Sequence, residues 1–237
     1  ENNPRRYKVQ GKETMTKEQT QSSSNELPDN EDHDDSNPDL SVYSETHQIP
    51  SHIFGHSRTL MVLDLRRAEN IEGIGDNACF DCDFLTTIKL CPSLRHIGAK
   101  AFNCCPSLSD VDFVSAPNLE SIGKSAFAFC ASLEYVDLSN STALTTLSVG
   151  SFSNCLTLQE VKLAPNLTCI QRDGFHHCMM LKKVCWNENL LEILDGAFAY
   201  CTLLQTHDLR NAKRLRTLGK RSFCNNLQGT LPEELYD

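Results

Sequence analysis

One short phrase recurs along most of this chain of 237 residues. Its clearest copy, residues 119–138, reads LESIGKSAFAFCASLEYVDL. The first Phe of the phrase returns at intervals of 22 to 26 residues, as Phe54, Phe80, Phe102, Phe127, Phe152, Phe175, Phe198 and Phe223. A unit of this length is too short to bury its own apolar face, so successive units must stack against one another. The period therefore predicts a solenoid.

Each unit contains two apolar segments with different patterns. Residues 133–138 end in an alternation of apolar and polar side chains, which predicts a strand with one buried face. Residues 119–122 hold a second apolar pair and are followed by Gly123, where we expect the chain to reverse with a positive φ. Residues 124–127 predict a short helical or 3-10 turn that points the repeat Phe inward. Every unit then adds one aromatic ring to a common buried column.

The first 50 residues differ in composition from the rest. They hold 11 Asp and Glu against 5 Lys and Arg, so they carry −6 of the formal net charge of −9. Their few apolar residues cannot offset the roughly 1–2 kcal/mol of backbone entropy that each ordered residue loses. We therefore expect a disordered acidic tail over 1–50 and a solenoid over 51–228. Residues 229–237 would be a C-terminal cap or the start of a further repeat.

The repeat resembles a known class. The order Cys-x-x-Leu-x-x-Val-x-Leu, followed by Leu-x-x-Ile-Gly-x-x-Ala-Phe-x-x-Cys, is similar to the BspA-like leucine-rich repeat over about residues 54–227. One unit departs from it, since Cys79 precedes Phe80 and Cys82 comes one place early. The resemblance implies an α/β leucine-rich-repeat solenoid with short strands and short helical or 3-10 turns. It also implies a protein-binding module without catalysis, of the kind found in cell-surface adhesins.

The chain holds 12 cysteines, and five of them stand three places after a repeat Phe: Cys105, Cys130, Cys155, Cys178 and Cys201. Side chains stacked on successive coils have nearly parallel Cβ vectors, which does not suit a disulfide. We expect these thiols to be buried and reduced, which favours an intracellular compartment. Cys79 and Cys82 have Cys-x-x-Cys spacing, but no second pair completes a zinc site. We therefore expect no metal and no cofactor.

Several function classes lack support in the sequence. It contains no Gly-rich phosphate loop and no Gly-x-Ser-x-Gly motif, so we expect no enzyme activity. Residues 51–237 are nearly neutral and have no basic stripe, which argues against a nucleic-acid partner. No run approaches the roughly 18 apolar residues of a membrane span. A protein partner remains, and the sequence indicates no oligomeric state.

A candidate partner-binding surface lies on the predicted strands. Side chains between the buried strand residues point off the exposed face of the solenoid. In neighbouring units they form an acidic surface around one aromatic residue: Asp110, Asp112, Tyr135, Asp137 and Glu160. Lys162 and Asp208 stand in the same columns and complete the candidate set. Such a surface would select a basic protein and speed its encounter, or its charges would only keep the strands soluble.

These features favour a non-catalytic protein-protein interaction scaffold, located in the cytoplasm, that binds its partner on the exposed strand face. Two alternatives stay open. The first is an adhesion or sensing module that is secreted or held at the cell surface, where the sequons at Asn140 and Asn166 could carry glycans. The second is the regulatory part of a larger enzyme whose catalytic domain lies outside these residues.

Overall fold

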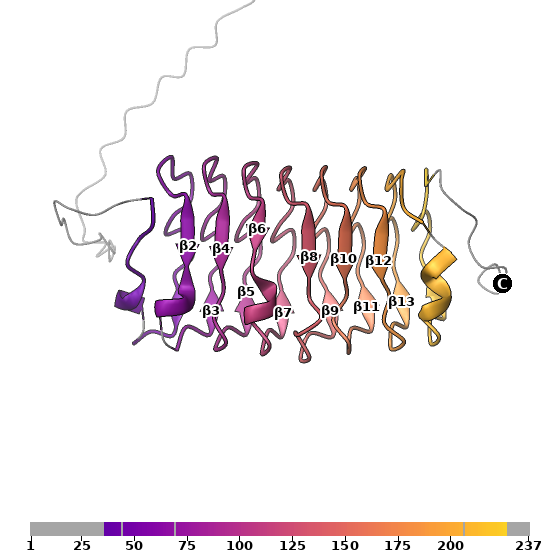
Figure 1. Cartoon of the computed structure of the whole chain (residues 1–237), viewed down its shortest axis with the longest axis horizontal. Coiled ribbons are helices and arrows are strands. Elements are labelled where there is room, and N and C mark those ends of the chain that lie inside the picture. Colours follow the sequence, from indigo (N-terminus) through magenta and orange to yellow (C-terminus); the bar gives the residue numbers. More distant parts are fainter. Residues whose placement is uncertain (1–35, 44, 69, 206, 227–237) are drawn as a thin grey trace, which may run out of the picture. The chain divides into compact units, whose positions relative to one another are not determined.

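The structure, a computed structural model, describes residues 36–43, 45–68, 70–205 and 207–226. These residues form a parallel β-solenoid in which each repeat makes about one coil (Figure 1). The predicted solenoid is therefore confirmed. The predictions for residues 1–35 and 229–237 lie outside the described residues.

The longest sheet contains eight strands of two residues each, all parallel. In order across the sheet they are β1 Gln48–Ile49, β3 Gly73–Ile74, β5 His96–Ile97, β7 Ser121–Ile122, β9 Thr146–Leu147, β11 Cys169–Ile170, β13 Glu192–Ile193 and β14 Thr217–Leu218. These are the segments of the second apolar pair, which we predicted to precede a reversal of the chain at the following Gly. Their backbone is extended and pairs with the same segment of the next coil, as Ile97 does with Ile122. The chain turns directly afterwards, over residues 124–129 in one coil.

The glycine after this apolar pair allows the coils to approach closely. Gly123 does not adopt the positive φ that we expected. A Cβ added to Gly123 would lie 2.5 Å from the backbone nitrogen of Ala99 and 2.6 Å from the carbonyl carbon of Gly98. Since no L side chain fits at those distances, any other residue here would push the coils apart.

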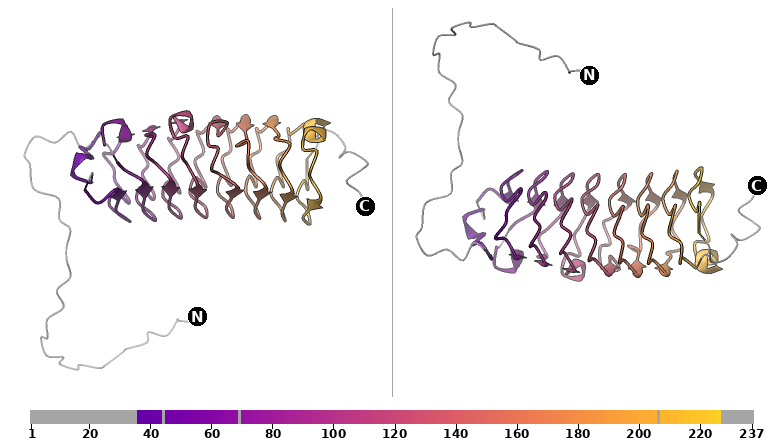
Figure 2. Two further views of the ribbon diagram at one scale, coloured as in Figure 1. Left: turned by 90° about the horizontal axis from the view of Figure 1, so that it is seen from below. Right: turned by 90° about the horizontal axis from the view of Figure 1, so that it is seen from above.

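Six further strands lie on the opposite side of the solenoid and form what we call the strand face (Figures 1 and 2). One sheet contains β2 Val62–Asp64, β4 Thr87–Lys89 and β6 Asp110–Val111, and the other contains β8 Tyr135–Asp137, β10 Glu160–Lys162 and β12 Lys183–Cys185. The central residue of each three-residue strand is buried and its two neighbours are not, as in β8, where Val136 is buried. The Leu-x-x-Val-x-Leu strands are thus confirmed in these six coils.

The repeat-Phe turns form a third line of contacts between coils, which we call the turn edge: residues 76–81, 99–104, 124–129, 149–154, 172–177, 195–200 and 220–225. The Phe127 N–H donates to the Ser151 carbonyl at 2.8 Å. Alternate N–H groups bond to the next coil in this way, and the Ala126 N–H donates to Gly123 O at 3.2 Å within the turn, so residues 124–127 form the short turn that we predicted, with Phe127 buried. The 3-10 helices of the described chain lie elsewhere: η1 Ser41–Tyr43, η2 Leu65–Arg67, η3 Phe113–Ser115 and η4 His207–Asn211.

The predicted aromatic column runs through the core. Its fully buried members are Phe102, Phe127, Phe152, Phe175 and Phe198. Adjacent rings in this series have centroids 5.1 to 5.4 Å apart and stack on one another. Burial of one Phe contributes about 1.5–3 kcal/mol, so the column is a main source of stability.

One member of the predicted column needs correction. Cys79 occupies the place of the repeat Phe, because its N–H donates to Ala101 O as the N–H of Phe102 donates to Ala126 O. Cys79 is fully buried, whereas Phe80 lies one place further along and is only half-buried. The Phe80 ring instead packs edge-on against His56, with centroids 5.3 Å apart. Cys82 therefore stands at the regular distance after Cys79, and the repeat is not displaced.

The solenoid begins before residue 51. Ile49 is fully buried and lies in β1, which pairs with β3. Leu40 is 3% exposed and belongs to the same core. The boundary that we placed at residue 50 from composition therefore moves toward the N-terminus, because scattered apolar residues in a polar stretch reach the end of the stack.

Candidate partner-binding face

The strand face is divided between β6 and β8, which belong to separate sheets. Phe113 follows β6 where other units have the strand Leu, and its ring is buried in the core. It packs edge-on against Phe127 and Phe152, with centroid distances of 5.3 and 6.2 Å. The chain then enters η3 directly, so that β6 is only two residues long. The division separates the predicted acidic residues into two groups.

Asp110 and Asp112 lie on the β6 side of this division. Asp110 is exposed. Asp112 caps η3, where its Oδ1 accepts a hydrogen bond from the Ser115 N–H at 3.3 Å and its Oδ2 accepts from the Ser115 hydroxyl at 2.6 Å. Asp112 therefore has a structural role in addition to its charge.

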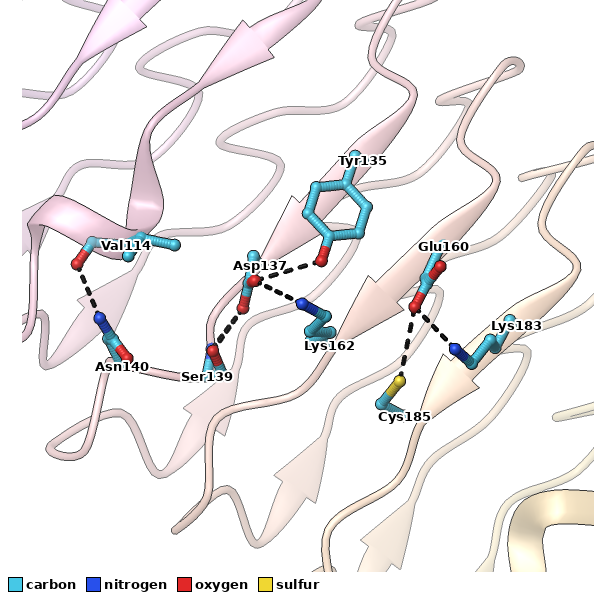
Figure 3. Close-up of polar contacts among 9 residues, drawn as sticks. All are labelled: Val114, Tyr135, Asp137, Ser139, Asn140, Glu160, Lys162, Lys183 and Cys185. Carbon is cyan, nitrogen blue, oxygen red and sulfur yellow. Dashed lines mark hydrogen bonds and ion pairs between the residues drawn. The ribbon is translucent and has the colours of Figure 1, made fainter.

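The other group centres on Asp137 (Figure 3). Its Oδ2 accepts hydrogen bonds from the Tyr135 hydroxyl at 3.1 Å and from the Lys162 ammonium at 2.9 Å. Its Oδ1 accepts from the Ser139 N–H at 3.0 Å and from the Ser139 hydroxyl at 2.6 Å. The Lys162 nitrogen also lies 5.3 Å from the centroid of the Tyr135 ring, within the range of a cation–π interaction. Three of the predicted residues thus form one connected cluster.

This cluster sets the charge states of its members. Burial by itself would raise the pKa of Asp137, but the hydrogen bonds from Ser139, Lys162 and Tyr135 outweigh it and lower the pKa to about 2. The hydrogen bonds to Tyr135 and Asp137 raise the pKa of Lys162. At neutral pH the cluster therefore contains one carboxylate and one ammonium group.

A second pair of charges lies beside the first. The Lys183 ammonium contacts the Glu160 carboxylate at 3.0 Å, and the Cys185 thiol donates to the same carboxylate oxygen at 3.6 Å (Figure 3). These contacts follow from the register, which places Glu160 opposite Lys183 and Asp137 opposite Lys162. The surface across β8, β10 and β12 therefore has mixed charge, where we expected a predominantly acidic one.

Tyr135 is the aromatic residue available to a partner on this part of the strand face. It is 40% exposed, and its hydroxyl is fixed by Asp137. Val114, in η3 on the other side of the division, is 44% exposed. Asp208 lies in η4 and not in a strand, so the structure does not place it in the strand face with the others.

The cysteines of the repeat form a ladder with a structural role. All five predicted thiols are fully buried, and Cys82 is a sixth member. Each donates a hydrogen bond to a carbonyl in the preceding coil at 3.0 to 3.2 Å: Cys82 to Phe54, Cys105 to Cys79, Cys130 to Phe102, Cys155 to Phe127, Cys178 to Phe152 and Cys201 to Phe175. Burial raises the pKa of the Cys130, Cys155 and Cys178 thiols well above the ordinary range. These three thiols are suited to packing and to satisfying carbonyl groups, and not to nucleophilic chemistry.

Sequence reasoning missed a second ladder, made of asparagine side chains. Their amides donate to carbonyls of the preceding coil at 2.9 to 3.1 Å: Asn118 to Pro92, Asn140 to Val114, Asn166 to Thr142 and Asn189 to Pro165. Two of these residues are the sequon asparagines. The available signal was an Asn directly before the second apolar pair in three of these units, at Asn118, Asn166 and Asn189. The hydrogen bonds give both sequon asparagines a structural role.

Two further observations bear on function. Among the residues that the structure describes, no three His, Cys, Asp or Glu side chains converge as metal ligands would. In the same residues, no helix has the length and apolar character needed to cross a membrane.

A comparison with protein families matches the model of the BspA type leucine rich repeat region, in 6 copies over residues 47–178 and 120–230. The chain belongs to this family. The resemblance noted in the sequence is thereby confirmed, as is the predicted class of leucine-rich-repeat solenoid. None of the curated proteins matches the chain.

Solved structures of bacterial leucine-rich repeat proteins are similar to this BspA-type chain. The T. pallidum leucine rich repeat protein is 25% identical with a TM-score of 0.62, and the match covers 73% of this chain and 78% of the other. A leucine-rich repeat protein from Bacteroides ovatus is 24% identical with a TM-score of 0.51, covering 75% and 56%. A leucine rich cell surface protein from Faecalibacterium prausnitzii is 23% identical with a TM-score of 0.50, covering 67% and 41%.

Proposed function

We propose that this BspA-type chain is a non-catalytic interaction scaffold whose protein partner docks on the strand face at β8, β10 and β12. The observation that carries the proposal is Tyr135, whose ring is 40% exposed while its hydroxyl is held by Asp137 and its face lies near Lys162. An aromatic side chain fixed in this way loses little conformational entropy on binding. Such residues dominate the binding energy of many interfaces.

The charges favour a partner with basic side chains, but only at one end of this surface. Asp137 and Glu160 already contact Lys162 and Lys183, so they offer little net attraction. Asp110 is exposed, and no ion pair within the described residues neutralises it. A basic side chain of the partner would therefore contact Asp110, in the coil before Tyr135. This contact would mainly speed association, since exposed charges act on the encounter rate.

The test is to capture partners with the full chain and to measure binding kinetics of the recovered protein. Tyr135→Ala should weaken binding roughly 5- to 30-fold through faster dissociation, the equivalent of about 1–2 kcal/mol. Phe84→Ala is the matched control, because Phe84 is also an exposed aromatic, at 51%, and lies outside the six strands. Asp110→Lys should instead slow association and reduce the salt dependence. Equal losses for the Tyr135 and Phe84 variants would mean that the partner binds elsewhere.

The predicted cytoplasmic location rested on the number of reduced cysteines. Because the ladder thiols are buried and hydrogen-bonded, they would resist oxidation in any compartment, and their number no longer favours the cytoplasm. One similar structure is described as a cell surface protein. We therefore propose the cell surface as the location. A membrane-impermeant biotin reagent should label the protein on intact cells of its source, and labelling that requires lysis would refute this.

A further inference from the structure

The turn edge contains a cavity of about 650 Å³ that the proposed function does not use. It lies between the turns of three successive coils, residues 172–177, 195–200 and 220–225. Backbone hydrogen bonds fix these turns to one another, as from the Asp173 N–H to Asp195 O at 3.0 Å and from the Tyr200 N–H to Cys224 O at 2.7 Å. A volume of this size suits a bound side chain or a short segment of a partner.

One wall of this cavity is aromatic. Tyr200 is 39% exposed, and its ring stacks on His177 with centroids 4.3 Å apart. His176 packs edge-on against the same ring at 5.5 Å. Burial, together with the neighbouring His177, lowers the pKa of His176, so its imidazole is neutral at pH 7. The wall therefore offers flat, largely apolar surface to a ligand.

The rim of the cavity carries three exposed cationic side chains, Arg172, Lys220 and Arg221. Within the described chain, no ion pair joins any of them to a carboxylate. Two carboxylates also line the cavity. Asp195 Oδ1 accepts a hydrogen bond from the Lys220 backbone N–H at 2.8 Å, and Asp173 Oδ1 would lie 2.5 Å from a Cβ added to Gly196. The three cations therefore remain available to an anionic group.

Exposed apolar side chains also occur in or just after the turns of earlier coils. Phe129 is 51% exposed, Leu156 is 42% and Met179 is 46%. Phe129 and Tyr200 hold equivalent turn positions, since their N–H groups donate to Ser153 O and Cys224 O of the next coil.

We infer that this part of the turn edge is a second docking site, which binds an acidic peptide segment of a partner protein. Carboxylates of the segment would contact Arg172, Lys220 and Arg221, and its apolar side chains would pack on Tyr200 and Met179. Charge complementarity selects this occupant, because three cations without an ion pair in the described residues outnumber the two carboxylates at the cavity, whose walls are aromatic and aliphatic. The site lies apart from the strand face and does not depend on the partner proposed there.

The test uses the full chain and a fluorescein-labelled peptide of alternating Glu and Leu, with fluorescence anisotropy as the readout. Peptides of alternating Gln and Leu, or Lys and Leu, are the matched controls. Arg172→Glu combined with Arg221→Glu should weaken binding of the Glu peptide about tenfold or more. The control variant Lys89→Glu with Lys213→Glu changes the net charge equally on other surfaces and should weaken it less than about twofold. Tyr200→Ala should weaken binding, and Phe84→Ala should not.

Three outcomes would overturn the inference. Equal weakening by the two double variants would mean that only net charge matters. Equally tight binding of the Gln peptide would mean that the cations play no part. If inorganic phosphate displaced the Glu peptide completely and Tyr200→Ala bound the peptide as tightly as the unmodified chain, the site would be a simple anion site. Apart from the half-buried Lys89, the variants replace exposed side chains, and circular dichroism should show unchanged folding.

Discussion

The replacement Phe127→Ala tests whether the aromatic column holds the coils together. The Phe127 ring is fully buried and touches three other rings. It stacks on Phe102 and Phe152 with centroid distances of 5.2 and 5.3 Å and packs edge-on against Phe113 at 5.3 Å. Truncation would remove all three contacts and leave a cavity between coils.

The expected cost follows from these contacts. Replacement of a buried Phe by Ala typically costs about 3–5 kcal/mol. Each aromatic pair contributes about 0.5–1.5 kcal/mol beyond burial, and three pairs are lost, so the upper end applies, about 4–5 kcal/mol. With a urea dependence of roughly 2–3 kcal/mol per M, the unfolding midpoint should fall by about 1.3–2.5 M.

The assay is equilibrium unfolding in urea, followed by far-UV circular dichroism and by fluorescence of Trp186. The ring centroids of Trp186 and Phe198 are 5.3 Å apart, so the Trp186 fluorescence reports on coils C-terminal to the substitution. Because each coil is stabilised by its neighbours, both signals should shift together. Phe84→Ala, at a ring that is 51% exposed, is the control and should change little. A Phe127→Ala midpoint equal to that of the control would refute the role of the column.

Three further outcomes are expected. Deletion of residues 1–50 should lower the thermal midpoint by several degrees, because it removes the buried Ile49. Deletion of residues 1–35 should leave the thermal midpoint unchanged. Equal midpoints for the two deletions would contradict the corrected boundary. Cys155→Ala should lower the free energy of unfolding in urea by about 1–3 kcal/mol, because the buried Phe127 carbonyl loses its donor. Cys155→Ser should recover part of that loss. Because the pKa of Asp137 is about 2 when folded, below its ordinary 3.8, its stabilisation is present above about pH 4 and is lost as the pH falls toward 2. The urea midpoint of Asp137→Asn should therefore change less with pH between about 4 and 2 than the midpoint of the unmodified chain. An equal change of midpoint with pH in the two proteins would count against the cluster.

The sequence predicted the parts of the fold that repeat identically. The period placed the repeat Phe and the following Cys at the same point of the five coils from Phe102 to Phe198, and the structure buries both there. It could not locate the second sheet, because a two-residue strand has no room for an alternating pattern. It also misplaced the Phe80 unit, since two residues of different size, Cys79 and Phe80, could each fill the column. Only the hydrogen bond from Cys79 to the next coil shows which one does.

The positions of Tyr135, Asp137 and Lys162 on neighbouring strands were predictable, but the electrostatic character of their surface was not. The columns placed Lys162 next to Asp137, so the signal for a pair between coils was present. Whether two such side chains contact depends on exact register, which periodicity does not fix. The division of the strand face lies where Phe113 begins η3, which Asp112 caps. A 3-10 helix also begins at Leu65, so the size of the apolar residue does not explain the division, and the apolar pattern could not predict it.

The most direct test of the scaffold is hydrogen exchange of the full chain, alone and saturated with a captured partner. Binding on the strand face should slow exchange of backbone amides in residues 135–137, 160–162 and 183–185, and Tyr135→Ala should reduce this protection at the same partner concentration. Exchange in the long sheet on the opposite side should stay unchanged. Protection confined to that long sheet, with β8, β10 and β12 unaffected, would contradict the proposed binding face.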